Sequence, residues 1–399
     1  MGWLGLDDTD TLTDGCTTYT LHCLLNALPD GVTASNPSLV RLWPFAEQRT
    51  RGNAAVAVEL LTEDEPRLME FLDAYWNEHL APLCGLVSQS DHQRPQAPTD
   101  PGMVWFSEQP SSSEYYSRAV QSRVTIDEGP PPTRQWGGRG CIGAIAAVVW
   151  HKQMTTWEAI AWRREERWNG VERNVCNVAI KRVSQLDKTF MTRDPTSQRS
   201  LISPRGTCPV LFGVRGTTQK AAEHAAELLL EAKATEPIIG LRVFQTNQAS
   251  DDHLQTILSS TVKSIDILRR GTTKIETDEG EWMAFAESGD VKLMAQSLQP
   301  GDRIDVCGLE STSGVVHIEK MRITYATPLK VRPVCTACNR TMKAMGTNQG
   351  VRCPECKAKQ SNSWREIERE VTLNTWVQPP IDARRHLARP LEWDGHHSS

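Results

Sequence analysis

The chain has 399 residues, of which 39% are hydrophobic and 23% are charged. This length predicts several domains, and this composition excludes a disordered or fibrous chain. The longest apolar run, residues 142–150, is far shorter than the roughly 20 residues that a membrane span needs, and the acidic N-terminus does not resemble a signal peptide. The 11 cysteines are an odd number without a dense disulfide framework, so we expect reduced thiols in a soluble, cytoplasmic protein.

The charge of the chain is unevenly distributed. The formal net charge is −5, which argues against a protein that binds nucleic acid through its overall charge. Residues 330–389, however, contain 12 Lys and Arg residues against 5 Asp and Glu residues. This distribution predicts a basic C-terminal module that holds a polyanion and an acidic body that carries out the chemistry.

Hydrophobic periodicity predicts a mixture of strands and helices in the first 255 residues. We expect strands over residues 3–6, 54–61, 156–163 and 209–215. We expect helices over residues 18–28, 66–80, 114–124, 138–150 and 219–232, the third opened by a capping box at Ser111–Glu114. A proline-rich polar segment predicts a surface loop over 88–102. The sequence Gly-Pro-Pro-Pro at 129–132 predicts a break, with no strand between it and Trp136.

The pattern changes in the last third of the chain. Short alternating runs from Val262 to Tyr325 are separated by turn sequences such as Ser-Gly-Asp and Pro-Gly-Asp. This spacing predicts a small antiparallel barrel of about 65 residues, similar to an OB-fold.

Four cysteines near the C-terminus form the strongest site pattern. Cys335 and Cys338 make one Cys-x2-Cys pair, and Cys353 and Cys356 make a second pair after 14 intervening residues. Two such pairs place four thiolates tetrahedrally about one Zn²⁺, and because no coordination position stays open, we expect the zinc to be structural. Asn339 follows the first pair and tolerates a left-handed turn. The alternative is a set of four unligated cysteines.

Acidic residues follow the first predicted strand. Asp7, Asp8 and Asp10 lie at its C-terminal end, and Thr17 and Thr18 begin the next helix. Carboxylates in this position suit Mg²⁺, which takes one or two of them together with phosphate oxygens and water. The helix start favours an anion because its N–H groups are free to donate. The alternative is that the three aspartates cap turns and a threonine caps the helix.

A glycine-rich segment opens the apolar helix predicted from residue 138. Gly138, Gly140 and Gly143 spell GxGxxG, but no strand is predicted before them, so they support a dinucleotide fingerprint only weakly. A better interpretation is a helix start that lets phosphate approach the backbone, with Arg139 as a fork-shaped donor. The alternative is a tightly packed helix entry. The P-loop sequence GxxxxGK[ST] does not occur.

Several of these segments resemble one archaeal family, the 2-agmatinylcytidine synthetases that act on the AUA-decoding isoleucine tRNA. The matching sequences run in one order along nearly the whole chain: GLDDTD at 5–10, CTTY at 16–19, RGNAA at 51–55, EYYSRAV at 114–120, GRGCIGAIAA at 138–147, CPVLFGVRG at 208–216, TNQ at 246–248 and PPIDARRHLARPL at 379–391. The first cysteine pair departs from the family, because residues 335–339 read CTACN where the family usually has CPxCG.

The resemblance implies an α/β multidomain fold. It consists of a kinase-like α/β domain interleaved with a ferredoxin-like α+β domain, then an OB-fold β-barrel and a C-terminal zinc ribbon. We place the kinase-like domain at residues 1–53 and 133–195, the ferredoxin-like domain at 54–132 and 196–255, the OB-fold at 256–330, and the zinc ribbon with a basic tail at 331–399.

The resemblance also implies an ATP-dependent ligase that phosphorylates the C2 oxygen of the wobble cytidine of this tRNA and replaces it with agmatine. The cofactors would be ATP, Mg²⁺ and structural zinc, and the partners would be the tRNA and agmatine, with no obligate protein partner. The implied catalytic residues are Asp7, Asp8, Asp10 and Thr17, of which the aspartates would hold Mg²⁺ and Thr17 would itself be phosphorylated. The implied ATP-binding residues are Thr18, Gly138, Arg139, Gly140 and Gly143, and the expected tRNA contacts are Arg340, Lys343, Arg352, Arg384 and Arg385.

Two other functions stay open. A related ATP-dependent enzyme with this architecture would use another amine or another RNA. A non-catalytic RNA-binding protein built from the barrel and the ribbon would leave the acidic and glycine-rich motifs without a role.

Overall fold

The computed structural model describes residues 1–11, 15–49, 52–87, 97–168, 171–254, 256–346, 349–361 and 364–394. Arg51 and most of the predicted loop at 88–102 lie outside these ranges. The chain divides into two compact units. Unit 1 contains Met1–Gln255 and a C-terminal piece, Ile381–Pro390, which we call the return segment, and unit 2 contains Thr256–Pro380 and the chain from Leu391 onward. No helix in the described ranges is long and apolar enough to cross a membrane.

Unit 1 is built on one sheet. Within the described residues it has ten strands in the order β6-β5-β1-β4-β3-β10-β7-β9-β8, with β2 paired to β4. The strands are β1 (Gly2–Asp7), β2 (Thr33–Ala34), β3 (Ser38–Arg41), β4 (Ala54–Leu61), β5 (Gly102–Phe106), β6 (Arg134–Gly137), β7 (Thr156–Arg163), β8 (Thr189–Phe190), β9 (Val210–Gly216) and β10 (Ile238–Thr246). Two antiparallel halves meet where β3 pairs with β10 in parallel. This sheet is not the parallel sheet that a dinucleotide fold needs.

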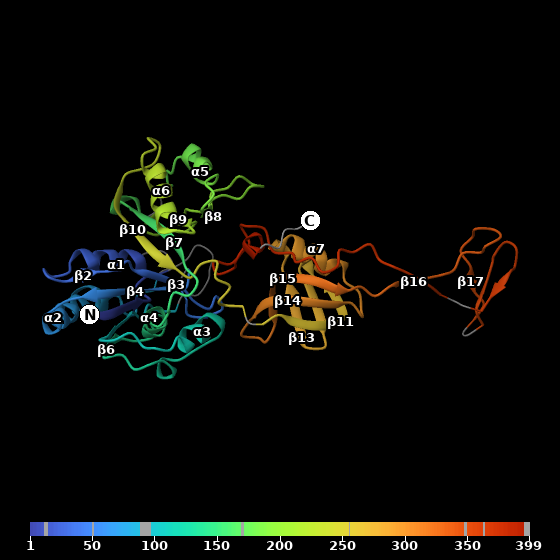
Figure 1. The fold of residues 1–399 in the computed structure, drawn as a ribbon, viewed down its shortest axis with the longest axis horizontal. Coiled ribbons are helices and arrows are strands. Elements are labelled where there is room, and N and C mark those ends of the chain that lie inside the picture. Colours follow the sequence, from blue (N-terminus) through green and yellow to red (C-terminus); the bar gives the residue numbers. More distant parts are fainter. Residues whose placement is uncertain are drawn as a thin grey trace. The chain divides into compact units, whose positions relative to one another are not determined.

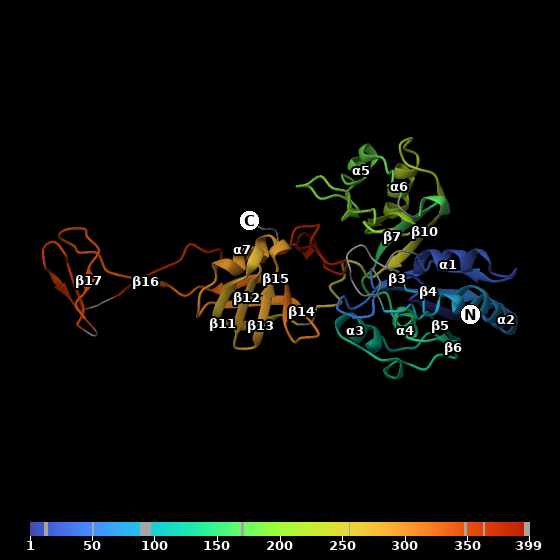
Figure 2. The ribbon, with the colours of Figure 1, turned by 180° about the vertical axis from the view of Figure 1, so that it is seen from behind.

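Helices cover both faces of this sheet. They are α1 (Thr17–Asn26), α2 (Glu65–Tyr75), α3 (Glu114–Gln121), α4 (Cys141–Val148), α5 (Asn177–Val183) and α6 (Gln219–Leu230). Alternate residues of β4 point to opposite faces, so Val56 and Val58 pack with α1 and α2, whereas Ala55 and Ala57 pack with α3 and α4. Figures 1 and 2 show α1 and α4 on opposite sides of the sheet at β4. Helices α5 and α6 form a third core with β7 and β9.

Most of the predicted elements of unit 1 are confirmed. The strands expected at 54–61 and 156–163 coincide with β4 and β7, and the helix expected at 66–80 is α2 continued by a π-helical turn, Trp76–Leu80. The prediction of no strand before Gly138 is wrong, because Arg134–Gly137 forms β6 and pairs with β5. β6 lies at the end of the sheet, where neighbouring prolines are tolerated.

The predicted capping box of α3 is also wrong. Ser113 is the N-cap residue, but its side chain makes no capping bond, and Ser112 Oγ instead accepts the N–H of Glu114 at 3.2 Å. The helix ends at Gln121, three residues before the predicted end, because Ser122 is extended.

Unit 2 contains a small barrel and a cysteine-bearing ribbon. The barrel strands are β11 (Leu258–Ile267), β12 (Thr273–Thr277), β13 (Gly280–Ala284), β14 (Arg303–Glu310) and β15 (Val316–Tyr325), closed in the order β11-β12-β13-β15-β14. Helix α7 (Asp290–Ser297) packs on the barrel core. The predicted small barrel is confirmed, with five strands, although its β13–β15 pairing is parallel rather than antiparallel. The remaining strands are β16 (Leu329–Val331), β17 (Lys343–Ala344), β18 (Val351–Arg352), β19 (Lys359–Gln360) and β20 (Arg365–Ile367).

Candidate active site

The acidic turn after β1 lies against the start of α4. Asp7 is the last residue of β1, and its Oδ1 accepts the N–H of Asp8 at 2.7 Å. A Cβ on Gly143 would overlap the Asp7 carboxylate, so this position of α4 needs a glycine. Desolvation and the neighbouring charge of Asp8 raise the pKa of Asp7 well above its usual range. The two motifs that the sequence singled out separately are therefore in contact.

Arg139 links the acidic turn to the glycine-rich segment. Its Nη2 donates to Asp8 Oδ2 at 2.8 Å, and its backbone N–H donates to Asp100 Oδ2 at 2.8 Å. The backbone N–H of Asp100 also donates to Asp8 Oδ2, at 3.1 Å. Desolvation raises the pKa of Asp8, and the Arg139 guanidinium opposes that rise.

The backbone of the glycine-rich segment is already hydrogen bonded. The N–H of Gly138 donates to Pro101 O at 3.0 Å, and that of Gly140 donates to Asp100 O at 2.9 Å. A Cβ on Gly138 or on Gly140 would overlap Asp100 or the backbone of Gly102, respectively. The packed helix entry considered from the sequence therefore describes this segment, and a phosphate-binding role for it stays a prediction.

Asp7 and Asp8 are the kind of ligands that Mg²⁺ takes. In the described ranges, the one group of three or more potential metal ligands consists of cysteines, so Asp7, Asp8 and Asp10 do not bring three carboxylates to one point. Mg²⁺ needs one or two carboxylates, with phosphate and water as further ligands. Asp7 and Asp8 offer hard oxygen donors, and a dication would favour the ionised form of Asp7, whose pKa is raised by burial and then by the charge of Asp8.

The four cysteines of the ribbon fit a structural zinc. The sulfur atoms of Cys335, Cys338, Cys353 and Cys356 all lie within 4.8 Å of one another. Asn339 has φ of 49°, so the left-handed turn expected after the first pair is confirmed. Thiolates at this spacing are the ligand set of a closed tetrahedral zinc site.

The predicted tRNA contacts in the ribbon are available at its surface. Arg340, Lys343 and Arg352 are all exposed, and Arg340 Nε lies 3.4 Å from Glu355 Oε2. Exposed basic side chains of this kind neutralise phosphates without reading sequence.

A second polar site is a cavity of about 470 Å³ in unit 1. Asp10, Thr17 and Thr18 form part of its wall, as do Arg384 and His386 of the return segment. The other predicted site residues of unit 1 before the return segment do not line it: Asp7, Asp8, Gly138, Arg139, Gly140 and Gly143. Arg385 does not line it either; its guanidinium stacks over the Phe45 ring at 4.7 Å.

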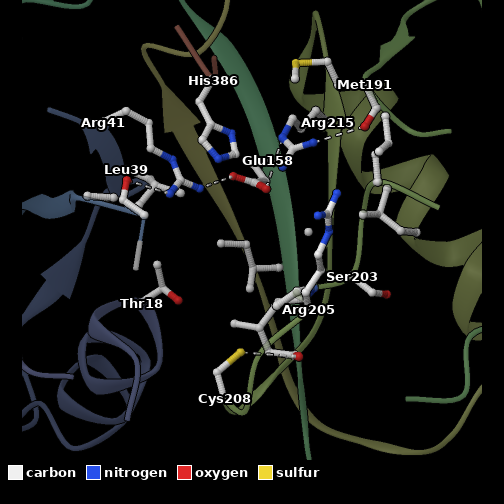
Figure 3. Close-up of a pocket in the computed structure, with 18 of the residues that line it drawn as sticks. Thr18, Leu39, Arg41, Glu158, Met191, Ser203, Arg205, Cys208, Arg215 and His386 are labelled. Carbon is white, nitrogen blue, oxygen red and sulfur yellow. Dashed lines mark hydrogen bonds and ion pairs between the residues drawn. The ribbon is translucent and has the colours of Figure 1, made fainter. Parts of the chain in front are cut away.

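Glu158 lines this cavity and lies between two arginines, Arg41 and Arg215 (Figure 3). Its Oε2 is 3.6 Å from Arg41 Nη2, and its Oε1 is 3.4 Å from Arg215 Nε. Gln248 Nε2 donates to Glu158 Oε2 at 2.7 Å. A Cβ on Gly213 would overlap this carboxylate, which explains the glycine in the middle of β9.

His386 completes this group from the return segment, beside Arg41 and Arg215 (Figure 3). The charge of Arg41, together with burial and Arg215, lowers the pKa of His386 well below its usual range. Sequence reasoning missed Arg41, Glu158, Arg215 and His386 as site residues. Two signals were available: Arg215 and His386 lie inside segments that resemble the family, and Arg41, Glu158 and Arg215 are charged residues in mostly apolar strands, β3, β7 and β9.

An α/β unit with a charged cavity, followed by a five-stranded barrel and a four-cysteine ribbon, defines a multidomain protein with a nucleotide-sized site and a zinc-ribbon module. Family models described as the TiaS TCKD domain, the TiaS FLD domain and the TiaS C-terminal zinc ribbon domain match residues 3–65, 138–253 and 332–371. The chain belongs to the TiaS family, the 2-agmatinylcytidine synthetases of isoleucine tRNA.

Individual relatives match almost the whole chain. The isoleucine-tRNA 2-agmatinylcytidine synthetase TiaS of Methanosarcina acetivorans is 30% identical over 97% of this chain and 96% of its own length. The protein of the same name from Methanosarcina mazei is 31% identical over 97% and 96%. The crystal structure of TiaS in complex with its isoleucine tRNA and ATP has a TM-score of 0.80 at 28% identity, covering 98% of this chain and 97% of that one. The complex of TiaS with the same tRNA, AMPCPP and agmatine has a TM-score of 0.77 at 25% identity, covering 98% and 96%.

Proposed function

We propose that this chain is an ATP-dependent ligase that attaches agmatine to the wobble cytidine of the AUA-decoding isoleucine tRNA. The observation that carries the proposal is the near full-length similarity to TiaS proteins, which includes a TiaS structure with isoleucine tRNA and ATP and another with agmatine. The chain also contains the acidic turn, the threonines of α1 and the ribbon cysteines, the residues to which the resemblance assigns these roles.

The chemistry follows from the substrate. The C2 carbonyl oxygen of cytosine is a poor leaving group, so an amine does not displace it directly. The oxygen attacks a phosphoryl group of ATP, and the P–O bond to the rest of the nucleotide breaks. The amine of agmatine then attacks C2, the C2–O bond breaks, and phosphate leaves with both electrons of that bond. Such a transfer needs positioned donors and charge neutralisation more than covalent chemistry by the protein.

Two regions of unit 1 would share the binding of metal and phosphate: the acidic turn with Arg139, and the cavity lined by Thr17 and Thr18. Asp7 and Asp8 would hold Mg²⁺, which neutralises charge on the transferring phosphoryl group when it is bound. Arg139, already paired with Asp8 at 2.8 Å, is the nearby fork-shaped donor for ATP phosphates. Thr17 and Thr18 at the start of α1 face the cavity, and Thr17 would carry the phosphorylation that the family implies. The boundaries predicted for the kinase-like and ferredoxin-like domains remain part of this proposal.

The direct test is incorporation of radiolabelled agmatine into the unmodified isoleucine tRNA in the presence of ATP. We expect label in the RNA only when ATP is present, and none in a tRNA whose wobble base is uridine. Unlabelled putrescine or arginine should compete poorly. Absence of label, or equal transfer of another amine, would contradict the proposal and favour the related enzyme with a different amine.

The Asp7→Asn variant tests the role of the acidic turn. It keeps the size of the side chain beside Gly143 but removes a metal ligand, so we expect agmatine incorporation to fall at least a hundredfold while tRNA binding stays within twofold, since one well-placed electrostatic group contributes about 10²–10³ in rate. The matched control is Asp30→Asn, an exposed aspartate far from both motifs in the sequence. Wild-type incorporation by Asp7→Asn would exclude the proposed metal site.

A further inference from the structure

The return segment is fixed onto unit 1 by its backbone. The N–H groups of Ala249 and Asp251 donate to the carbonyls of His386 and Leu387, both at 2.9 Å. Leu387 is buried in the core that also contains α3 and α4. The position of His386 in the cavity wall is therefore set by two hydrogen bonds and a buried neighbour.

Polar side-chain atoms without partners gather at this cavity. Arg41 Nε, Ser200 Oγ and His386 Nδ1 are buried and have no hydrogen-bond partner in the described part of the chain, and all three residues line the cavity. A buried donor without a partner is destabilising by about 1–3 kcal/mol, so such groups mark a place that a ligand completes.

The charges of the cavity identify the chemistry of that ligand. Arg41 and Arg215 share one carboxylate, Glu158, which leaves one positive charge at the centre. Arg205, Arg384 and Asp10 also line the cavity, so its four arginines exceed its three carboxylates by one. Asp382 pairs with Arg199 at 3.1 Å and so adds little negative charge. A dication such as agmatine does not suit this centre, whereas a group with several anionic oxygen acceptors does.

We propose that the centre of this cavity binds a phosphoryl group of a nucleotide substrate, with Arg41, Arg215 and His386 as its ligands. The inference rests on the proposed function and adds a binding subsite to it. A phosphoryl group offers three acceptor oxygens, so it accepts from Arg41 Nε, from the Nδ1–H tautomer of His386 and from Arg215. The return segment therefore contributes a ligand, His386, to the substrate site, although it follows the zinc ribbon in sequence.

Two substrates share this chemistry, ATP and the wobble nucleotide of the tRNA, and separate binding measurements distinguish them. Dissociation constants for ATP alone and for the unmodified isoleucine tRNA alone are measured by calorimetry on the full chain. The variants are His386→Gln and Arg41→Lys, of which the second keeps the charge facing Glu158 but removes Nε–H. The matched control is His224→Gln, an exposed histidine of α6 that lies 3.8 Å from Glu227.

We expect both variants to weaken one of the two ligands about tenfold, since a hydrogen bond to a charged group contributes at least that factor, while His224→Gln changes neither. Weaker ATP binding would assign the subsite to an ATP phosphate, and weaker tRNA binding would assign it to the wobble nucleotide. Binding of both ligands within twofold of wild type in His386→Gln, with an unchanged melting temperature, would overturn the inference, as would a wild-type chain that binds neither. Because binding needs no turnover, a chain that binds both ligands but transfers no agmatine would overturn the proposed function alone.

Discussion

At the scale of single residues, Glu158 shows how unit 1 accommodates a buried carboxylate. It is 3% exposed, and its oxygens face two guanidinium groups and one side-chain amide. Burying an ionic group is unfavourable unless it is paired and hydrogen bonded, and Glu158 meets both conditions. Its removal would leave Arg41 and Arg215 facing each other without the group that separates their charges.

We therefore expect Glu158→Gln to lower the free energy of unfolding by about 3 kcal/mol. This is the lower end of the effect found when one partner of a buried ion pair is removed. Urea denaturation at pH 7.5 measures the change in the free energy of unfolding. Glu47→Gln, an exposed site, serves as the control and should stay within about 0.5 kcal/mol of wild type. Equal effects of the two substitutions would show that the Arg41–Glu158–Arg215 group does not contribute to folding.

His386 gives a second prediction at this scale, on the pH dependence of stability. Arg41 and Arg215, with burial, lower its pKa in the folded chain, whereas the unfolded chain keeps the ordinary pKa near 6.5. Between these two values the unfolded state binds a proton that the folded state does not, so stability decreases as the pH falls below about 6.5. His386→Gln removes this contribution, and the difference in unfolding free energy between pH 7.5 and pH 5.5 should shrink. His224→Gln should leave that difference as in wild type; a loss of equal size in both variants would contradict the assignment.

At the scale of elements, the start of α4 depends on glycines that make room for acidic side chains. Replacing a helical glycine by alanine ordinarily stabilises a helix by about 1 kcal/mol. At Gly143 we expect the opposite sign, because the new Cβ would overlap the Asp7 carboxylate and overpacking costs about 1–3 kcal/mol. Thermal melting of Gly143→Ala should show a lower Tm than wild type. Gly206→Ala is the control, since no atom lies within 4 Å of its added Cβ, and a higher Tm for Gly143→Ala than for this control would refute the packing described here.

The elements also show what the sequence could and could not predict. Strands β4 and β7 and helix α6 were predictable because each is long enough to show a clear apolar pattern, and that pattern is read from neighbouring residues alone. β6 was missed because it has four residues and follows a proline run, and its pairing with β5 decides its conformation. The ribbon cysteines were predictable because their ligand spacing is local. Arg41, Glu158 and Arg215 come from three strands that only the sheet order brings together, so no local pattern identifies them as one group.

At the scale of the whole molecule, the chain passes through the barrel and ribbon and then returns. Unit 1 is completed by Ile381–Pro390, which the sequence prediction had grouped with the basic C-terminal module. The chain therefore passes between the two units three times, after Gln255, after Pro380 and after Pro390. A tRNA bound by the ribbon would be bound to a part of the chain that continues, through Pro380 and Ile381, into the segment that supplies His386.

Removal of the zinc tests whether the ribbon contributes binding and unit 1 contributes chemistry. Cys353→Ser removes one of the four thiolates, and because a structural zinc site supplies the folding free energy of a small ribbon, we expect zinc to be lost and the ribbon to unfold. Exposed Arg340, Lys343 and Arg352 would then no longer present a common surface, so tRNA affinity should fall at least tenfold at about 150 mM salt, with a shallower salt dependence. ATP affinity should stay within twofold of wild type, because Asp7, Asp8 and Arg139 belong to unit 1.

Elemental analysis measures the zinc content, calorimetry measures the ATP and tRNA affinities, and a salt titration measures the salt dependence of tRNA binding. A Cys353→Ser chain that keeps one equivalent of zinc would refute the four-cysteine site, and one that loses zinc but keeps its tRNA affinity would show that the basic ribbon does not bind the RNA.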